Sequence, residues 1–192
     1  MYDCMVKYII PLITVIAFIA AIVIALAFLT GHTATAQSSP EFAQFTTLSH
    51  ATTDQCAYLG DKAAIYNDVD SQPNGTYFQG SCCSPMDWNH YQQQIAGLKN
   101  YSNISAVPQN PYNVSVGQIK QMLGYYDSIV LTQSQNATFN QAASLTNDKS
   151  WCCCQCWAWY AHAGLAKYMI KNYNYNVSQV VTLINLEDCC GG

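Results

Sequence analysis

Hydrophobic residues follow two different patterns along this chain. From Tyr8 to Leu29 they form one long stretch without a charged side chain. At a rise of about 1.5 Å per residue, this stretch is long enough to cross a hydrocarbon core of roughly 30 Å. Beyond it, apolar residues recur every three or four positions, which is typical of amphipathic helices. The pattern predicts an N-terminal transmembrane helix, or an uncleaved signal segment, followed by a helical domain.

Helix-start signals divide the second part of the chain into short segments. Ser115 and Thr132 each begin the capping-box form ahead of a periodic apolar stretch. Ser84, which a proline follows, is the expected N-cap of a helix with Trp88 on its apolar face. Further helices are expected at about 53–66, 150–171 and 177–186. The predicted fold is all-α: a single N-terminal transmembrane helix and a disulfide-stapled irregular bundle of five or six short helices.

The expected organisation has three parts. Residues 1–30 form a membrane anchor, residues 31–47 a polar tether, and residues 48–192 a cysteine-rich helical domain. Lys7 lies directly before the apolar stretch, and the positive-inside rule then places the C-terminal domain outside the cytoplasm. The sequence therefore predicts a single-pass membrane protein, with membrane lipid as one partner and an extracytoplasmic or cell-surface domain.

Composition excludes several classes of function. Charged residues make up only 9% of the chain, against about 25% in an ordinary soluble domain. All seven basic residues are lysines, and no cluster of them forms the basic face that nucleic-acid binding requires. The four histidines and the few glutamates form no coherent catalytic pattern. We therefore expect neither nucleic-acid binding nor an enzymatic activity.

Cysteine is far more frequent than usual, with ten in the chain. Such density is typical of a disulfide framework in an oxidising compartment. Adjacent cysteines seldom bond to each other, so each adjacent pair is expected to reach different partners. A central cluster would then bridge to both outer pairs and to Cys56, with at least one of the nine left over. The nine disulfide candidates are Cys56, Cys82, Cys83, Cys152, Cys153, Cys154, Cys156, Cys189 and Cys190.

The segment 151–157 is the main candidate for chemistry. A helix that begins near Ser150 would place Cys152 and Cys156 four residues apart on one face, and its positive end would lower their thiol pKa values. Because thiolates select copper(I) or zinc, a soft-metal site is the alternative to disulfides. A thiol–disulfide redox role is a further alternative, although no strand precedes the C-x-x-C. The metal-ligand candidates are Cys153, Cys154, Cys156, Cys189, Cys190 and His162.

Two other features bear on partners. The chain has six N-x-S/T sequons, about three times the roughly two expected from composition, and all follow the apolar stretch. They predict glycosylation at Asn74, Asn100, Asn103, Asn113, Asn136 and Asn176. Tryptophan and tyrosine are enriched at protein interfaces, so Trp157, Trp159 and Tyr160 are the expected partner-contact residues.

These observations favour a structural function. We expect a membrane-anchored, externally displayed accessory subunit of a membrane complex or cell-surface assembly. It would bind a protein partner or self-assemble, be stabilised by disulfides and need no cofactor. The alternative is a protein that binds copper or zinc through the cluster Cys152–Cys156.

Overall fold

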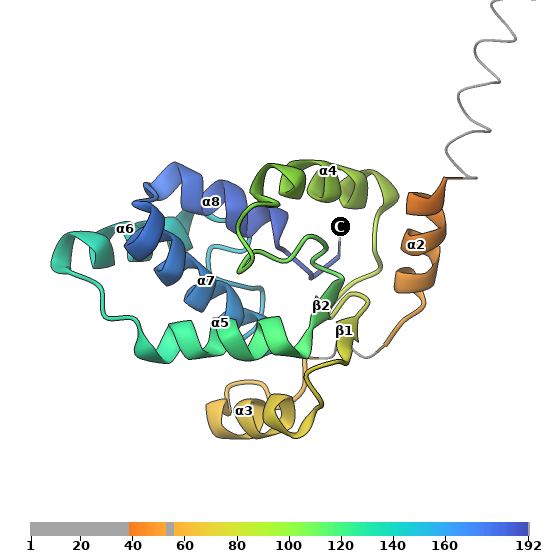
Figure 1. Ribbon diagram of the computed structural model, residues 1–192, viewed down its shortest axis with the longest axis horizontal. Helices are drawn as coiled ribbons and strands as arrows, with labels where there is room; N and C mark the ends of the chain where they lie inside the picture. Colours follow the sequence, from red (N-terminus) through yellow and green to blue (C-terminus); the bar gives the residue numbers. More distant parts are fainter. Residues whose placement is uncertain (1–38, 53–55, 192) are drawn as a thin grey trace, which may run out of the picture. The chain divides into compact units, whose positions relative to one another are not determined.

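The computed structural model describes residues 39–52 and 56–191. The chain divides into two compact units, Met1–Gln44 and Phe45–Gly192, and only residues 39–44 of the first are described. The described elements in chain order are α2 (Pro40–Ser49), α3 (Lys62–Ser71), β1 (Tyr77–Gln79), α4 (Trp88–Leu98), η1 (Lys99–Tyr101), β2 (Asn113–Ser115), α5 (Val116–Ser128), α6 (Gln133–Leu145), α7 (Trp157–Tyr173) and α8 (Val177–Leu186) (Figure 1). The described part is mostly helical, which confirms the all-α prediction at this level.

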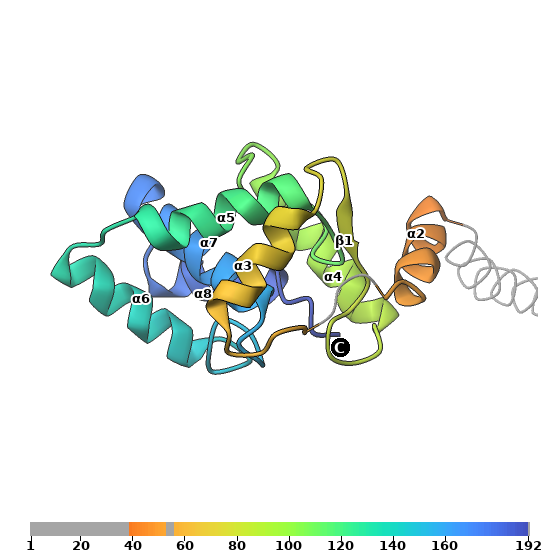
Figure 2. The same ribbon diagram turned by 90° about the horizontal axis from the view of Figure 1, so that it is seen from below.

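Helix α7 is the centre of the second unit. It contacts α3, α5, α6 and α8, and α5 runs alongside it in both views (Figures 1 and 2). Ala161, Leu165 and Met169 on α7 are fully buried. Gly164 lies where the two backbones approach each other, because a Cβ atom there would overlap the carbonyl oxygen of Met122 on α5. The small side chains of α7 thus set how closely α5 packs against it.

Side-chain caps define where three helices begin. Ser115, Thr132 and Asn176 each accept a hydrogen bond from the backbone N–H three residues later, at the first turns of α5, α6 and α8. At Thr132 and Asn176 a glutamine side chain also returns the bond, which completes a capping box. The predictions of helices after Ser115 and Thr132, and over 177–186, are confirmed.

Helix α4 begins later than the sequence predicted. Its N-cap is Asp87, whose Oδ1 accepts a hydrogen bond from the His90 N–H at 2.8 Å. Ser84, the expected cap, instead donates its hydroxyl proton to the carbonyl oxygen of Cys190 at 2.6 Å. The error arose because Ser84 has a partner 106 residues away, which no local pattern reveals.

Three further boundaries differ from expectation. Helix α3 covers Lys62–Ser71 rather than 53–66, because Asp61 caps it by accepting from the Ala64 N–H. Helix α7 begins at Trp157 rather than near residue 150, since the cysteine-rich segment before it forms a loop. The region expected as a polar tether up to residue 47 contains the start of α2.

A short antiparallel sheet, which the sequence reasoning missed, completes the second unit. Phe78 of β1 lies opposite Val114 of β2, and both side chains are buried. The Phe78 ring packs edge-on against Trp157 at a centroid distance of 5.2 Å. With only three residues each, these strands lack the longer alternation that identifies a strand in sequence. The sheet fixes the chain just before Cys82 and Cys83.

The expected single-pass membrane localisation needs correction. Within the described ranges, no helix is both long and apolar enough to cross a bilayer. The longest of these helices, α7, has 17 residues, about 25 Å at 1.5 Å per residue, and carries Lys167 and Lys171. The segment from Tyr8 to Leu29, on which the expectation and its lipid contact depended, lies outside the described residues.

Candidate functional site

Four loops that are distant in sequence bring cysteine sulfurs together. They lie before α3, between β1 and α4, before α7 and after α8. Figure 1 shows the C-terminal segment after α8 running back toward the strands. We refer to the nine cysteines on these loops as the cysteine cluster; they are Cys56, Cys82, Cys83, Cys152, Cys153, Cys154, Cys156, Cys189 and Cys190.

The sulfur atoms form a continuous network rather than isolated pairs. The Cys83 Sγ atom lies 3.0 Å from that of Cys153, 3.2 Å from that of Cys82, 3.3 Å from that of Cys56 and 3.8 Å from that of Cys154. These distances exceed the S–S bond length of about 2.05 Å. The sulfurs are therefore close together without being bonded, and disulfide formation between them stays a prediction.

Cys190 links the C-terminal segment to the same network. Its Sγ atom lies 3.0 Å from that of Cys153, 3.2 Å from that of Cys152 and 3.8 Å from that of Cys82. The proximity of the central segment to both outer pairs, expected from the sequence, is thus present in the structure. Each of these sulfurs has several neighbours, so the distances do not select one disulfide pairing.

Backbone hydrogen bonds hold the outer loops together independently of sulfur chemistry. The Cys82 N–H donates to the Cys189 carbonyl at 3.2 Å, and the Ser84 N–H donates to the Cys190 carbonyl at 2.9 Å. Gly191 follows with φ of 98°, and a Cβ atom there would overlap the Ser84 hydroxyl. The two loops approach so closely that only glycine fits at this position. The cluster is therefore preorganised by the fold.

Side chains of α7 hold the loop of residues 151–156 in place by hydrogen bonds. The Nδ1 atom of His162 lies 2.8 Å from the carbonyl oxygen of Trp151. Because a carbonyl only accepts, this nitrogen carries the proton and is not available as a metal ligand. The Gln155 side chain also donates to the Tyr160 hydroxyl at 3.1 Å, and the backbone carbonyl of Gln155 accepts from the Gly60 N–H at 3.0 Å. His162, an expected ligand, instead positions the cysteine loop.

Several groups of ligand atoms are close enough to hold a metal ion. In each group the atoms all lie within 4.8 Å of one another. The groups are Cys56, Cys82, Cys83 and Cys154; Cys82, Cys152, Cys154 and Cys156; Cys83, Cys153 and Cys190; and Asp148, Cys152 and Cys190.

The ligand candidates from the sequence are only partly brought together. Among the described residues, the groups include Cys153, Cys154, Cys156 and Cys190 but neither Cys189 nor His162. Cys152, the first residue of the expected metal-binding cluster Cys152–Cys156, is also in these groups, and Cys56, Cys82, Cys83 and Asp148 join them although sequence reasoning did not assign these four as ligands. Only their residue type could have identified these cysteines as ligands from the sequence. Cys56, for example, is not separated from the other cysteines by any spacing typical of a metal site.

Thiol acidity differs sharply within the cluster. Hydrogen bonds from Cys152 and Cys82 lower the pKa of Cys156 to about 2, with help from the N–H groups of Ala158 and Trp159 in the first turn of α7. The same contact raises the pKa of Cys152, so the shared proton stays there. The predicted effect of a helix N-terminus thus acts on Cys156, the N-cap residue of α7.

Carboxyl groups border the cluster on the side of the C-terminal segment. Glu187 is buried, its Oε1 has no hydrogen-bond partner among the described residues, and burial raises its pKa well above the ordinary value. Burial, with the nearby Cys190, also raises the pKa of Asp188 to about 7. Gln94 of α4 donates to the Asp188 carbonyl at 2.6 Å and so connects this segment to the helices.

Two of the three expected partner-contact residues belong to the core. Trp157 and Tyr160 are each only 4% exposed, and their rings pack against Phe78 and Tyr126 respectively. Trp159 is partly exposed, and its indole N–H donates to the Ser150 hydroxyl at 2.9 Å. This correction has a simple cause, since large aromatic side chains fill the interior of this chain as well as its surface.

The sequon asparagines are mostly at the surface. Asn113 is half-buried in β2, where its side-chain oxygen accepts a hydrogen bond from Gln79 at 3.0 Å. The exposed members are Asn74, Asn100, Asn103, Asn136 and Asn176. Exposure makes these five accessible for modification, and glycosylation stays a prediction.

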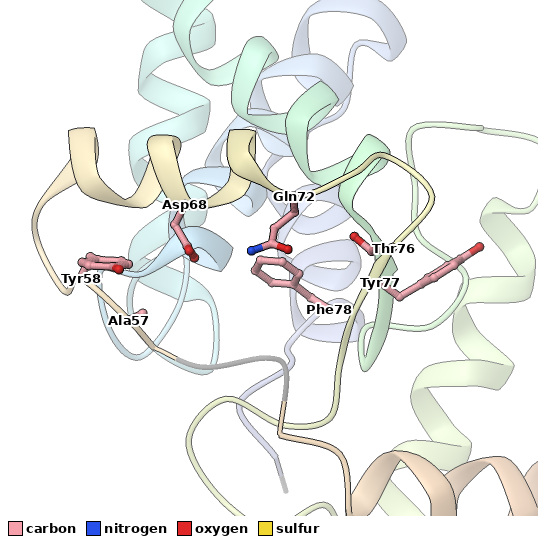
Figure 3. A pocket seen from close by; sticks show the side chains of 7 residues that line it. All are labelled: Ala57, Tyr58, Asp68, Gln72, Thr76, Tyr77 and Phe78. Atoms are coloured by element: carbon pink, nitrogen blue, oxygen red, sulfur yellow. The ribbon is translucent and has the colours of Figure 1, made fainter.

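A separate pocket of about 490 Å³ lies between α3, β1 and the loop after Cys56 (Figure 3). In Figure 3 the carboxylate of Asp68 and the amide of Gln72 lie close to the Phe78 ring, whereas the Tyr77 side chain points away from them. Asp68 is the one charged residue among those lining it, which are Ala57, Tyr58, Asp68, Gln72, Thr76, Tyr77 and Phe78. No cysteine lines this pocket, so it is distinct from the cluster.

Comparison of the chain with protein-family models, with curated proteins and with solved structures gave no match. The functional argument therefore depends on the chemistry of the cysteine cluster.

Proposed function

We propose that this protein binds a soft metal ion through the thiolates of the cysteine cluster, and that its role is binding rather than catalysis. The observation that carries the proposal is the presence of two four-cysteine groups whose sulfurs all lie within 4.8 Å of one another. Four thiolates around one point are the ligand set of tetrahedral structural zinc sites.

The network of sulfur contacts favours metal over simple pairing. A disulfide uses one partner for each sulfur, whereas Cys83 has four sulfur neighbours within 3.8 Å. In a tetrahedral site with Zn–S bonds of about 2.3 Å, neighbouring sulfurs are about 3.8 Å apart. In the group of Cys56, Cys82, Cys83 and Cys154, the sulfur contacts of 3.0 to 3.8 Å require only a small expansion to reach that geometry.

The ligand type bears on which metal is bound. The two four-membered groups contain cysteine alone, and tetrahedral S₄ sites select zinc or iron–sulfur centres. Copper(I) prefers the same soft thiolates, and methionine sulfur would add to that preference. Met169, the methionine on α7, is fully buried in the helical core. We therefore propose zinc first and copper(I) second.

Equilibrium dialysis of the full chain tests this proposal. The protein, reduced under anaerobic conditions, is dialysed against Zn²⁺ or Cu⁺ and analysed for bound metal. We expect stoichiometric metal that resists washing, and no such binding after all thiols are alkylated with iodoacetamide. Metal that is absent from the reduced protein, or that persists equally after alkylation, would contradict binding through thiolates.

A second candidate function is the structural accessory subunit stapled by disulfides. The observation that favours it is the 3.0 Å contact between the Sγ atoms of Cys56 and Cys154, residues 98 positions apart. A bond that closes so long a loop would stabilise the fold by as much as about 4 kcal/mol. Alkylation of the denatured protein before any reduction distinguishes the candidates, because disulfide-bonded cysteines do not react whereas metal-bound cysteines react once the metal is chelated.

A further inference from the structure

We propose that the cluster holds two metal ions that share two bridging thiolates, Cys82 and Cys154. This inference rests on the proposed metal-binding function and specifies its stoichiometry and connectivity. Both residues belong to each four-cysteine group, so the two groups are not independent alternatives. Two tetrahedra that share two corners share an edge, and a thiolate can donate lone pairs to two metal ions at once.

The remaining four ligands divide cleanly between the two ions. Cys56 and Cys83 complete one site, which we call the outer site. Cys152 and Cys156 complete the other, which we call the inner site. Each site has two terminal and two bridging cysteines. Six sulfurs therefore give each of the two ions four ligands.

The two sites differ in their exposure to solvent. The inner site has Cys152 at 3% and Cys156 at 0% exposure. The outer site has an exposed Cys83 and a half-buried Cys56. A chelator or an acceptor molecule reaches exposed ligands first, so the outer ion exchanges readily while the inner ion is retained. This asymmetry is suited to a protein that keeps one ion for its fold and passes the other on.

The charge of the six thiolates and the release of their protons are also consistent with two bound metal ions. Each metal ion displaces the protons of its thiol ligands into solution. Six thiolates carry more negative charge than two divalent cations neutralise. The N-terminus of α7 partly offsets this excess, because the N–H groups of Ala158 and Trp159 face the Cys156 sulfur.

Three cysteines of the cluster lie outside the shared-edge arrangement. Cys153 and Cys190 have sulfurs 3.0 Å apart, and Cys189 belongs to none of the metal-ligand groups in the described part of the chain. Cys153 is exposed and lies between Cys152 and Cys154 in sequence. It therefore offers a matched control, because Cys153→Ser removes a neighbouring thiol without removing a proposed ligand.

Cobalt(II) titration of the reduced full chain tests the inference. We expect thiolate-to-cobalt charge-transfer absorption to rise up to two equivalents. Magnetic susceptibility per cobalt should fall as the second ion binds, because bridging thiolates couple the two spins. Saturation at one equivalent, or two equivalents without magnetic coupling, would overturn the bridged pair while leaving thiolate metal binding intact. Absence of charge-transfer absorption would overturn the proposed function as well.

Variants then assign the sites. Cys56→Ser should weaken binding of the second equivalent at least about tenfold, since even loss of an outer-shell partner costs 10–100-fold. In the unaltered protein, EDTA should remove cobalt in two phases, a fast one from the outer site and a slow one from the inner site. Cys56→Ser should abolish the fast phase and leave the slow phase unchanged. Cys153→Ser should retain two equivalents and both phases. Equal losses of the second metal equivalent in these two variants would contradict the assignment of Cys56 to the outer site. The magnetic coupling measured on the wild-type protein tests the bridging thiolates even if a variant does not fold.

Discussion

The α5–α7 interface and the cysteine cluster are organised by different physical means. At the interface, Ser115 caps α5, the rings of Tyr125 and Tyr168 stack, and Gly164 allows the backbones to meet. At the cluster, residues 151–156 have no regular secondary structure, and the contacts join sulfurs up to 108 residues apart. Apolar packing is sufficient to define the first region. In the second, backbone hydrogen bonds bring the loops together, and the cysteine sulfurs they carry lie in contact.

The largest effect is expected from a methyl group placed between α5 and α7. Gly164→Ala would drive Cβ into the backbone carbonyl of Met122, which cannot move aside as a side chain can. We expect a loss of about 3 kcal/mol in the free energy of unfolding, the upper end for overpacking. Gly124→Ala, where Cβ meets open space on α5, should instead stabilise by up to about 1 kcal/mol. Urea unfolding measures both, and similar effects would contradict the close approach.

Metal removal should affect the other region. At a free zinc concentration about 100 times the Kd, binding adds about 2.7 kcal/mol to the free energy of unfolding. Chelation should therefore lower the thermal midpoint while the far-ultraviolet circular dichroism keeps its helical signal, because α5 and α7 are held by apolar contacts. An unfolding midpoint that does not respond to zinc or to chelator would contradict the division between the regions.

In the metal-free, reduced protein, acid should increase the stability contributed by the buried carboxyl groups, whereas the low pKa of Cys156 contributes a slope of the opposite sign. Burial raises the pKa of Glu187, and that of Asp188 rises to about 7, so the folded state keeps protons that the unfolded state has lost at neutral pH. This contribution is complete below the unfolded pKa near 4 and is lost as pH rises through the folded value.

Because tenfold in an ionisation constant corresponds to about 1.4 kcal/mol, we expect these carboxyl groups to contribute a gain of at least that size between pH 7 and pH 5. Denaturant titrations at each pH should show this slope reduced in Glu187→Gln and unchanged in the exposed Asp70→Asn. The same pH slope in the unaltered chain and in Glu187→Gln would contradict the burial of Glu187 in a protonated form.

The smallest effect concerns a local helix signal. Thr132→Ala removes the cap that accepts from the Gln135 N–H at the start of α6. We expect a loss of about 1 kcal/mol, without any change in metal stoichiometry. Asn140→Ala, at an exposed position inside the same helix, is the control and should change stability by less than about 0.5 kcal/mol. Equal losses in the two variants would mean that the cap does not set the stability of α6.

Sequence reasoning succeeded where structure is determined locally. The helices after Ser115 and Thr132 begin where predicted, because each capping side chain bonds only three residues ahead. It failed at Ser84 and at the start of α7. Ser84 bonds to Cys190, and residues 151–156 are held by His162 and by sulfur contacts, none of which is visible in a local pattern.

The candidate site was predictable in composition but not in arrangement. Cysteine density identified the central segment and its convergence with both outer pairs. The bridging positions of Cys82 and Cys154 emerge only once four loops are placed in space. The interpretation of Trp157 and Tyr160 as contact residues failed for the reverse reason, because residue type does not distinguish a buried aromatic ring from an exposed one.

Native mass spectrometry of the full chain, purified under anaerobic conditions, tests the central claim most directly. We predict a mass above that of the metal-free chain by two zinc ions, and ten cysteines that all become alkylated once the metal is chelated. A mass lower by two hydrogens for each disulfide, with no bound metal and with thiols that react only after reduction, would contradict metal binding by the cluster.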